Sequence, residues 1–311
     1  MNTRILIVGL GQMGARYLQG IGNLNNKLEI DIVEPNKIAY KKAIKIAELD
    51  SKNNIKVTTL SMQELKGHYN LVIVATSSSP RAEIVANLAK LISSDGWILE
   101  KVLAQSLEQL KLIESSLKGQ MAWVNTPRRV MSFYKDFKHL LNNCKTLSFK
   151  VNIQDFALGC NSIHFIDLVS FLSESKVDSV KIEAKSNWYK SKRLGYLEFN
   201  GVVSASYQNG STLSIDNSPN DSISISCAVA NREFQIIEDQ GVFANGEKLI
   251  SGRLSLQSEL TADIASSILT NETNTFLPTL DESINQHKSF FNALSKNAIL
   301  SKNLRNIWPI T

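Results

Sequence analysis

The sequence Arg4-Ile5-Leu6-Ile7-Val8-Gly9-Leu10-Gly11-Gln12-Met13-Gly14 joins an apolar run to three spaced glycines. The apolar run predicts a buried strand, and a helix-compatible run begins at Ala15. A G-x-G-x-x-G pattern between a strand and a helix is typical of a dinucleotide site. Gly9 permits the tight turn, Gly11 lets the backbone approach a pyrophosphate, and Gly14 allows close packing of helix on strand. We expect the pyrophosphate at the helix N-terminus, against its backbone N–H groups.

A second feature specifies the dinucleotide. Residues 28–33 predict the next strand, which ends at Glu34, twenty residues after Gly14. A carboxylate at this point can accept hydrogen bonds from a ribose 2′-OH, and it repels a 2′-phosphate. The sequence therefore predicts NAD in preference to NADP. The alternative is a tight turn followed by a solvated glutamate, which the strand–turn–helix context disfavours.

Length and composition indicate a globular protein of two domains. The chain has 311 residues, of which 43% are hydrophobic and 20% charged. The net charge of +5 is modest, and the densest lysine run, 37–45, falls on a predicted helix. This distribution does not indicate a nucleic-acid partner, although it is compatible with an anionic small molecule.

Cysteine usage and hydropathy indicate the compartment. Cys144, Cys160 and Cys227 form no C-x-x-C pair, and their odd number argues against a disulfide framework. A reducing cytoplasm fits this pattern best. We find no signal peptide and no apolar run of about 18 residues that would span a membrane. The histidines and cysteines also lack the spacing of metal ligands.

Strands and helices alternate through the first third of the chain. This alternation predicts a doubly wound parallel sheet, an α/β fold of the Rossmann type. Serine precedes several helices, where its hydroxyl can cap the first turn, and Ser61 to Glu64 has the pattern of a capping box. The predicted helices are 36–49, one starting at 61, 79–92 and 106–117; the predicted strands are 55–58, 71–75, 97–99 and 121–124.

The pattern changes after about residue 125. Helices are predicted at 133–142, 163–172 and 280–296, and the chain is mostly strand from 180 onward. Asn209-Gly210 and Asn245-Gly246 predict hairpins, which require antiparallel pairing. We therefore predict a Rossmann domain at 1–124 and an α+β domain with a largely antiparallel open sheet at 125–311. The helix from about 280 is expected to pack near the first domain, and an apolar open sheet face is expected to mediate self-association.

Glu100 and Lys101 end a predicted strand, at the sheet edge where ligands of open α/β sheets bind. A lysine there can reach the nicotinamide end of a cofactor and donate a proton or hydrogen bond to a substrate oxygen. The alternative is an ordinary strand-end lysine in solvent.

His164 and Asp167 lie three residues apart, and so on one face of a predicted helix. The imidazole could act as general acid or base with the carboxylate orienting it, or the pair could simply staple the helix. The other histidines, His68, His139 and His287, have no partner pattern, and we interpret them as structural or exposed.

Two further clusters have both a functional and a structural interpretation. Arg128 and Arg129 follow a strand end, where they could clamp an anionic or polyhydroxylated ligand or form a basic connector. The segment Asn187-Trp188-Tyr189-Lys190 could stack on a sugar or base, but core aromatic residues of a strand look the same and are favoured. The chain has no G-x-S-x-G and no P-loop.

Taken together, these segments resemble the Gfo/Idh/MocA family of NAD(P)-dependent sugar oxidoreductases over nearly the whole chain. Glu100-Lys101-Val102-Leu103-Ala104 resembles the Glu-Lys-Pro-Leu-Ala motif of the family, and residues 162–167 resemble its Gly-x-His-x-x-Asp segment. The glycine turn at 5–14, the strand 71–76, the segment 124–129 and the helix entry at 277–283 complete the resemblance.

The resemblance implies a Rossmann domain followed by an α+β domain, and it implies roles for individual residues. Lys101 and His164 would be catalytic. The substrate would be bound by Arg128, Arg129, Asn161 and Asp167. The cofactor would be bound by Gly9, Gly11, Gln12, Met13, Gly14, Glu34, Ala75, Thr76, Glu100 and Lys101.

The chain departs from the family pattern at two positions. Val102 replaces the proline after the lysine, and Cys160 replaces an aspartate that often lies four residues before the histidine. A neutral thiol cannot relay a proton as a carboxylate does, so either His164 and Lys101 suffice, or Asn161 compensates, or the protein has lost redox turnover. The resemblance implies an NAD-dependent oxidoreductase acting on a sugar, a sugar acid or a nucleotide-linked sugar, and we expect a homodimer or homotetramer. The alternative is a non-enzymatic NAD-binding sensor of the same fold.

Overall fold

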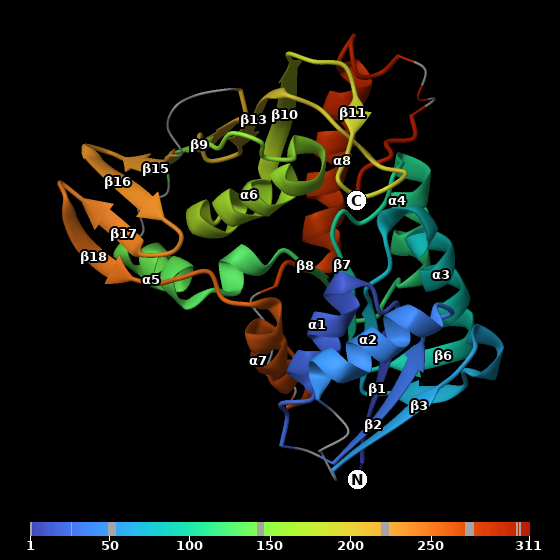
Figure 1. The fold of residues 1–311 in the computed structure, drawn as a ribbon. Coiled ribbons are helices and arrows are strands. Elements are labelled where there is room, and N and C mark those ends of the chain that lie inside the picture. Colours follow the sequence, from blue (N-terminus) through green and yellow to red (C-terminus); the bar gives the residue numbers. More distant parts are fainter. Residues whose placement is uncertain are drawn as a thin grey trace. The chain divides into compact units, whose positions relative to one another are not determined.

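The computed structural model describes residues 2–25, 27–48, 54–141, 146–218, 224–270, 277–302, 304 and 306–311 (Figure 1). Cys144 and the predicted helix ends at Leu49 and Asn142 lie outside these residues. Internal contacts divide the chain into two compact units. The first comprises Met1–Leu103, Glu108–Asn125 and Ser255–Leu280; the second comprises Ala104–Leu107, Thr126–Leu254 and Asp281–Thr311.

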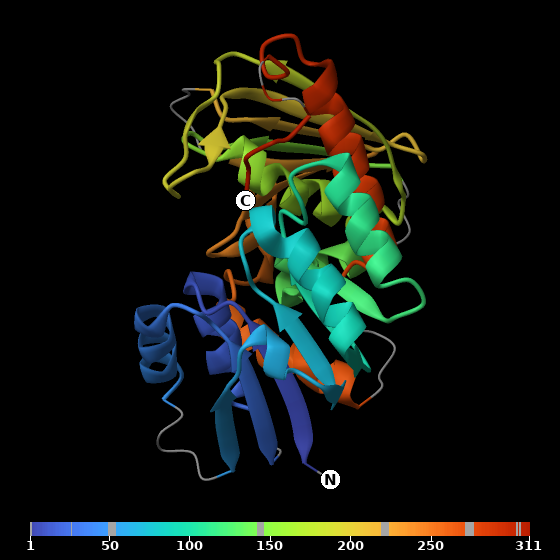
Figure 2. The same ribbon diagram turned by 90° about the vertical axis from the view of Figure 1, so that its right-hand side faces the viewer.

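The first unit contains the predicted parallel sheet. Its strand order is β3-β2-β1-β5-β7-β8, and every neighbouring pair is parallel. Figure 2 shows β1, β2 and β3 side by side, in blue. The order reverses between β1 and β5, which makes their carboxyl ends the switch point of a doubly wound fold. The bounds are β1 Thr3–Val8, β2 Leu28–Val33, β3 Ile55–Thr59, β5 Leu71–Val74, β7 Trp97–Glu100 and β8 Ala122–Asn125.

The central strands are apolar because they are covered on both faces. Every side chain of β5 is buried, and so are residues 5–8 of β1, as expected for the middle of a parallel sheet. The helices of this unit are α1 Gln12–Ile21, α2 Lys37–Ala47, α3 Ser78–Leu91, α4 Leu107–Ser116 and α7 Gln257–Leu269, of which the first residue of α4 falls in the second unit. Asn36 caps α2 by accepting from the backbone N–H groups of Ile38 and Ala39.

One predicted helix is much shorter than expected. Ser61 and Glu64 do form the capping box, but it supports only the single turn η2, Met62–Glu64. The chain then reaches Gly67, which has a φ of +83° and is the first residue of the short strand β4, Gly67–Tyr69. β4 pairs in parallel with β6, Ile92–Ser94. A local start signal thus does not produce a helix where the following residues favour a turn.

α7 comes from late in the sequence and packs against α1 within the first unit. Sequence patterns did not indicate this return of the chain. We predicted a division at 1–124 and 125–311, with the helix from about 280 near the first domain. This division is simpler than the interleaved units, and it stays a prediction.

The second unit is built on an eight-stranded sheet with the order β10-β13-β14-β9-β15-β16-β17-β18. Only β14 and β9 pair in parallel among its neighbours, so the predicted largely antiparallel sheet is confirmed. Both predicted hairpins form. Asn245 and Gly246 have φ of 50° and 81° in a two-residue turn, as a primed turn requires. The bounds are β9 Ser148–Asn152, β10 Val177–Ala184, β13 Gly201–Tyr207, β14 Thr212–Asp216, β15 Ser224–Val229, β16 Arg232–Ile237, β17 Gly241–Ala244 and β18 Glu247–Ser251.

One face of this sheet packs on α6, Leu158–Ser173 (Figure 1). Buried side chains such as Phe149, Val203 and Leu213 form that face. The alternate residues carry hydroxyl, amide and charged groups, so the expectation of a broad apolar open face is wrong. They include Ser148, Lys150, Asn152, Ser204, Ser206, Thr212, Ser214, Ser224 and Ser226.

The remaining elements of the second unit are η3 Pro127–Val130, α5 Ser132–Leu140, β11 Tyr189–Lys190, β12 Leu197–Glu198 and α8 Leu280–Lys296, whose first residue falls in the first unit. Trp188 packs edge-on against Phe199 and stacks on Trp308, and its indole N–H donates to the Leu300 carbonyl. Trp188 therefore packs inside the unit as the core interpretation predicts, whereas Tyr189 is exposed and does not. Among the described residues, no helix is both long and apolar enough to cross a membrane.

Gly20→Ala tests the close packing of α1 on α7. A Cβ at Gly20 would lie 2.5 Å from the Ser258 carbonyl oxygen and 2.6 Å from Thr261 Cβ, so the helices would have to separate. We expect a loss of about 1–3 kcal/mol in the free energy of unfolding, measured by urea denaturation. Gly11→Ala, at the N-cap of the same helix, has room for its Cβ and is the matched control. Equal stability of the two variants would contradict this packing.

Candidate active site

The glycine turn lies at the switch point of the first unit. Gly9 follows β1 with a φ of +89°, and a Cβ there would lie 3.1 Å from the backbone nitrogen of Thr76, just after β5, and 3.0 Å from its Cγ2. A Cβ on Gly14 would lie 2.0 Å from the Gly9 carbonyl oxygen. Two of the three glycines are therefore required because backbone packs directly on backbone.

Gly11 is different, because it faces open space. A Cβ built there would meet no described atom within 4 Å beyond its chain neighbours. Gly11 is the N-cap residue of α1, so the open space adjoins the N-terminus of that helix. Backbone N–H groups at a helix N-terminus attract anions, and this space fits the pyrophosphate of a dinucleotide.

Glu34 binds the glycine turn directly. One carboxylate oxygen accepts from the Leu10 backbone N–H at 2.6 Å, and the other accepts from the Asn36 N–H at 2.7 Å. The side chain thereby joins the end of β2 to the turn after β1 and to the start of α2. Each carboxylate oxygen has a second lone pair, so ribose hydroxyls can still be accepted. Sequence reasoning did not identify the bond to Leu10.

Ala75 and Thr76 follow β5 and are half-buried. Thr76 Oγ1 is buried and has no hydrogen-bond partner in the described part of the chain. A buried hydroxyl in this state is costly, and a bound ligand can satisfy it. Thr76, one of the residues predicted to bind the cofactor, therefore has a hydroxyl that the described part of the chain leaves unsatisfied.

Glu100 ends β7 as a buried carboxylate. Its Oε1 accepts from the Tyr17 hydroxyl at 2.6 Å and from Asn125 Nδ2 at 2.7 Å. Asn125 also donates to Gln257 Oε1 at 2.9 Å, so residues of α1, β7, β8 and α7 share one network. Burial, followed by the charge of Glu100, raises the pKa of Tyr17 well above its usual value, which keeps this hydroxyl a donor. The predicted contact of Glu100 with the cofactor stays a prediction.

Lys101 is half-buried and directly follows Glu100. The peptide bond between Lys101 and Val102 is cis. The carbonyl oxygens of Val102 and Leu103 accept from Arg81, a buried side chain in the first turn of α3, and so does the carbonyl of Thr76. Sequence reasoning missed Arg81, since its pattern indicated only a helix start.

In the second unit, α6 carries His164 together with Cys160 and Asn161, and all three are half-buried. Cys160 lies four residues before His164 and therefore on the same helix face. The start of α6 is occupied by the buried carboxylate of Glu198, which accepts from the backbone N–H groups of Gly159 at 2.6 Å and Cys160 at 3.1 Å. This carboxylate offsets the positive end of the helix dipole.

Asp167 is fully buried, and groups of its own unit hold it. Thr126 Oγ1 donates at 2.6 Å, Gln286 Nε2 donates at 3.0 Å, and Arg129 Nε lies 3.2 Å away. Burial raises the pKa of the Asp167 carboxyl, against the opposing effect of Arg129. The spacing suggested that Asp167 pairs with His164. Among the described residues, however, Thr126, Gln286 and Arg129 hold this carboxylate, and His164 does not.

Arg128 makes a two-pronged ion pair with Glu238, at 2.7 Å and 3.1 Å. The Tyr134 hydroxyl donates to the same carboxylate at 2.8 Å, and the guanidinium lies 4.4 Å from the centre of the Phe165 ring. Arg128 and Arg129 therefore each have a carboxylate partner inside the second unit. Their predicted contact with a substrate stays a prediction, and so does that of Asn161 and Asp167.

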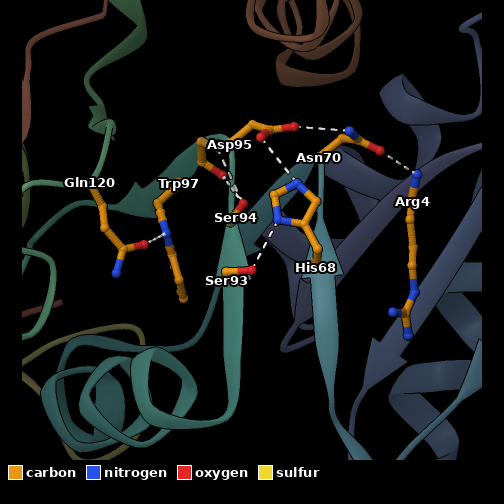
Figure 3. Close-up of polar contacts among 9 residues, drawn as sticks. Arg4, His68, Asn70, Ser93, Ser94, Asp95, Trp97 and Gln120 are labelled. Carbon is orange, nitrogen blue, oxygen red and sulfur yellow. Dashed lines mark hydrogen bonds and ion pairs between the residues drawn. The ribbon is translucent and has the colours of Figure 1, made fainter.

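A separate polar cluster lies near the amino ends of β1, β5 and β7, and Figure 3 shows its side chains. His68 Nδ1 is 3.0 Å from Ser93 Oγ, and its Nε2 is 3.0 Å from Asp95 Oδ1. Asn70 links Asp95 to the backbone of Arg4. No sequence pattern indicated these partners of His68, although its half-exposed side chain agrees with the interpretation of this histidine as structural or exposed.

This Ser93–His68–Asp95 order is that of a hydrolytic triad, but its setting is unsuitable for one. The His68 and Asp95 side chains are 51% and 45% exposed, so water competes for every contact. The cluster joins β4, β6 and the start of β1, and we interpret its role as stabilising the fold where these strands meet. Within the described residues, no group of three or more histidine, cysteine or acidic side chains could hold a metal ion.

No model of a protein family matches this chain, and no curated protein does. Solved structures do match it. An oxidoreductase from Agrobacterium radiobacter, in complex with NAD+, L-tartaric acid and magnesium, has a TM-score of 0.68 at 13% identity, covering 95% of this chain and 97% of that one. The scyllo-inositol dehydrogenase of Lactobacillus casei has a TM-score of 0.67 at 13% identity, with 97% of both chains covered.

A third similar structure is a super-repressor mutant of Gal80p from Saccharomyces cerevisiae, with a TM-score of 0.70 at 13% identity, covering 94% of this chain and 95% of that one. At this identity the comparisons establish the fold. The chain has the fold of the Gfo/Idh/MocA-type oxidoreductases, as the resemblance in the sequence implied.

Gly11→Ala tests whether the open space at the glycine turn is a binding site. The added methyl group fits the protein but occupies the space that the pyrophosphate needs. We expect the melting temperature to fall by less than in Gly14→Ala, since only the preference of the N-cap for glycine is lost. NADH binding, followed by fluorescence titration, should weaken about tenfold or more, since a steric clash replaces contacts with backbone N–H groups.

Gly14→Ala provides the contrast, because its Cβ would strike the Gly9 carbonyl and lower the melting temperature as well. Unchanged NADH affinity in Gly11→Ala would place the dinucleotide elsewhere.

Proposed function

We propose that this protein is an NAD-dependent oxidoreductase that transfers a hydride between nicotinamide and a secondary hydroxyl or ketone of a sugar, a sugar acid or a nucleotide-linked sugar. The observation that carries the proposal is the open space above Gly11 at the switch point of the sheet, in the same unit as Lys101 at the end of β7. Cofactors bind at this edge in doubly wound folds.

The residues present fit a dinucleotide. The glycine turn, with Gln12 and Met13 in the first turn of α1, would hold the pyrophosphate, and Glu34 would accept from the adenosine ribose. Ala75, Thr76, Glu100 and Lys101 would line the nicotinamide end. The complex of the Agrobacterium protein with NAD+ supports this assignment. NAD is proposed over NADP, because Glu34 would repel a 2′-phosphate.

The bound cofactor would supply the hydride acceptor or donor, and the protein would manage the proton. We propose that the Lys101 ammonium donates a hydrogen bond to the reacting substrate oxygen, and that His164 accepts or returns the proton. Arg128 and Arg129 would contact the substrate in addition to the carboxylates that they already bind. Asn161 and Asp167 complete the proposed substrate set.

A second candidate function is a non-enzymatic NAD-binding sensor. Cys160 favours it, since a neutral thiol stands where the resemblance places a proton-relaying carboxylate. The Gal80p structure supports it as well, because the name of that mutant is that of a repressor. The presence of both Lys101 and His164 favours the enzyme. For either function we propose a cytoplasmic homodimer or homotetramer without a nucleic-acid or membrane partner.

The cofactor preference can be tested at Glu34. We expect the parent protein to bind NADH about tenfold or more tightly than NADPH in calorimetric titrations, because a 2′-phosphate would lie beside the carboxylate. Glu34→Gln removes the charge, retains an acceptor oxygen and should bring the two affinities close together. Glu29→Gln, at the other end of the same strand, should leave the preference unchanged. Equal affinities in the parent protein would overturn the assignment.

Catalysis can be tested at Lys101 and His164. Cofactor reduction is measured against a panel of sugars, sugar acids and nucleotide sugars. With an active substrate, Lys101→Ala and His164→Ala should each lower turnover by about 10²–10⁴-fold, as loss of a general acid or base does. The double variant should lose little more than either single variant, because both groups act on one proton.

Lys90→Ala and His139→Ala, on exposed helix positions, are the matched controls. Full activity of Lys101→Ala would show that the catalytic assignment is wrong. NAD binding without turnover on any member of the panel would favour the sensor. If the protein is an enzyme, Cys160→Asp should keep its activity or raise it.

A further inference from the structure

Arg81 is a buried arginine that donates to main-chain oxygens. Its side chain is 1% exposed, and its guanidinium donates to the carbonyl groups of Thr76, Val102 and Leu103. A charge this deeply buried is costly unless hydrogen bonds replace its water. All four residues belong to the first unit, and neither cofactor nor substrate is needed to make these contacts.

The three acceptors lie on two separate turns. Thr76 follows β5, and Val102 and Leu103 follow β7, which is the neighbouring strand of the sheet. One side chain therefore ties together two turns at the carboxyl edge. The guanidinium spreads five donors over a planar fork that can span carbonyl groups on two turns, whereas the three donors of a lysine ammonium radiate from one nitrogen.

Lys101 lies on one of the tied turns, immediately before Val102. Thr76, with its unsatisfied hydroxyl, lies on the other. The charge of Arg81 also acts on the adjoining network, where it opposes the rise in the pKa of Tyr17. Fixing the two backbones fixes the origins of both side chains, which a freely moving turn would not do.

We propose that Arg81 is the positioning residue of the nicotinamide end of the cofactor site, acting through the turns that carry Thr76 and Lys101. This inference rests on the proposed function and adds a residue to which sequence patterns assign no role. Because the turns that Arg81 ties after β5 and β7 carry residues proposed for the nicotinamide end, its loss should affect the nicotinamide half of the dinucleotide and leave the ADP-ribose half unaffected.

The test compares NADH with ADP-ribose, which lacks the nicotinamide. In calorimetric titrations, Arg81→Ala should bind ADP-ribose as the parent protein does and should lose about tenfold in NADH affinity, as expected when a preorganised contact region loosens. Added guanidinium chloride at a concentration below denaturation should restore the NADH affinity of Arg81→Ala, and an equal concentration of urea should not.

A second readout needs no cofactor. Lys101 in the ligand-free protein is acetylated with a lysine-directed reagent and its rate is read by mass spectrometry, with Lys90 on the exposed surface of α3 as internal reference. Release of the turn in Arg81→Ala should raise the Lys101 rate several-fold relative to Lys90. Arg4→Ala is the matched control, since Arg4 also donates to a carbonyl in this unit, that of Lys66.

The outcomes separate the two proposals. A parent protein that binds neither NADH nor ADP-ribose would overturn the proposed function. Three other outcomes would overturn the role of Arg81 alone. The first is equal affinity of the parent protein for NADH and ADP-ribose. The second is an unchanged NADH affinity and Lys101 acetylation rate in Arg81→Ala, and the third is the same effects in Arg4→Ala. If Arg81→Ala does not fold, Arg81→Lys replaces it, since it retains the charge without the fork and should show the same selective loss for NADH.

Discussion

The close approach of backbone to backbone at the end of β1 is the constraint on which the first unit depends. Gly14 packs on the Gly9 carbonyl, and Gly9 packs on Thr76, so any side chain at either position would push β1, α1 and β5 apart. This contact brings the N-terminus of α1 to the switch point of the sheet. The open space at Gly11, the bond from Leu10 to Glu34 and the position of the turn after β5 all follow from it.

Both units hold buried carboxylates with hydrogen-bond donors from several elements. Glu100 is bound by Tyr17 and Asn125, whereas Asp167 is bound by Thr126, Gln286 and Arg129. Such groups are stable when their lone pairs are satisfied, and removing one donor leaves a buried oxygen without its hydrogen bond. Each network therefore fixes the relative positions of elements that are distant in sequence, at the cost of tolerating little change in any member.

The sequence predicted what depends on local pattern. The alternation of strands and helices, the glycine turn and the two Asn-Gly hairpins were all foreseen, because each is encoded within a few neighbouring residues. The pairing of Arg128 with Glu238 joins residues 110 positions apart, and no local signal announces it. No local signal indicates the bond between Glu34 and Leu10 or the bonds of Arg81 to three carbonyl groups. In these cases the partner atoms belong to the backbone, which is the same in nearly every residue. The capping box at Ser61 shows the converse, since a correct local signal was limited by the glycine that follows.

The open face of the second sheet has a consequence for assembly. Its ladders of serine, threonine and asparagine side chains are short and polar, so water wets this surface at little cost. A second sheet could approach it closely, but the hydroxyl groups would then have to exchange solvent for one another or retain bridging water molecules. Any contact made there would gain its specificity from matched hydroxyl pairs and its strength from only a small area of hydrocarbon. Such a contact would be reversible, and a protomer separated from it would remain well hydrated.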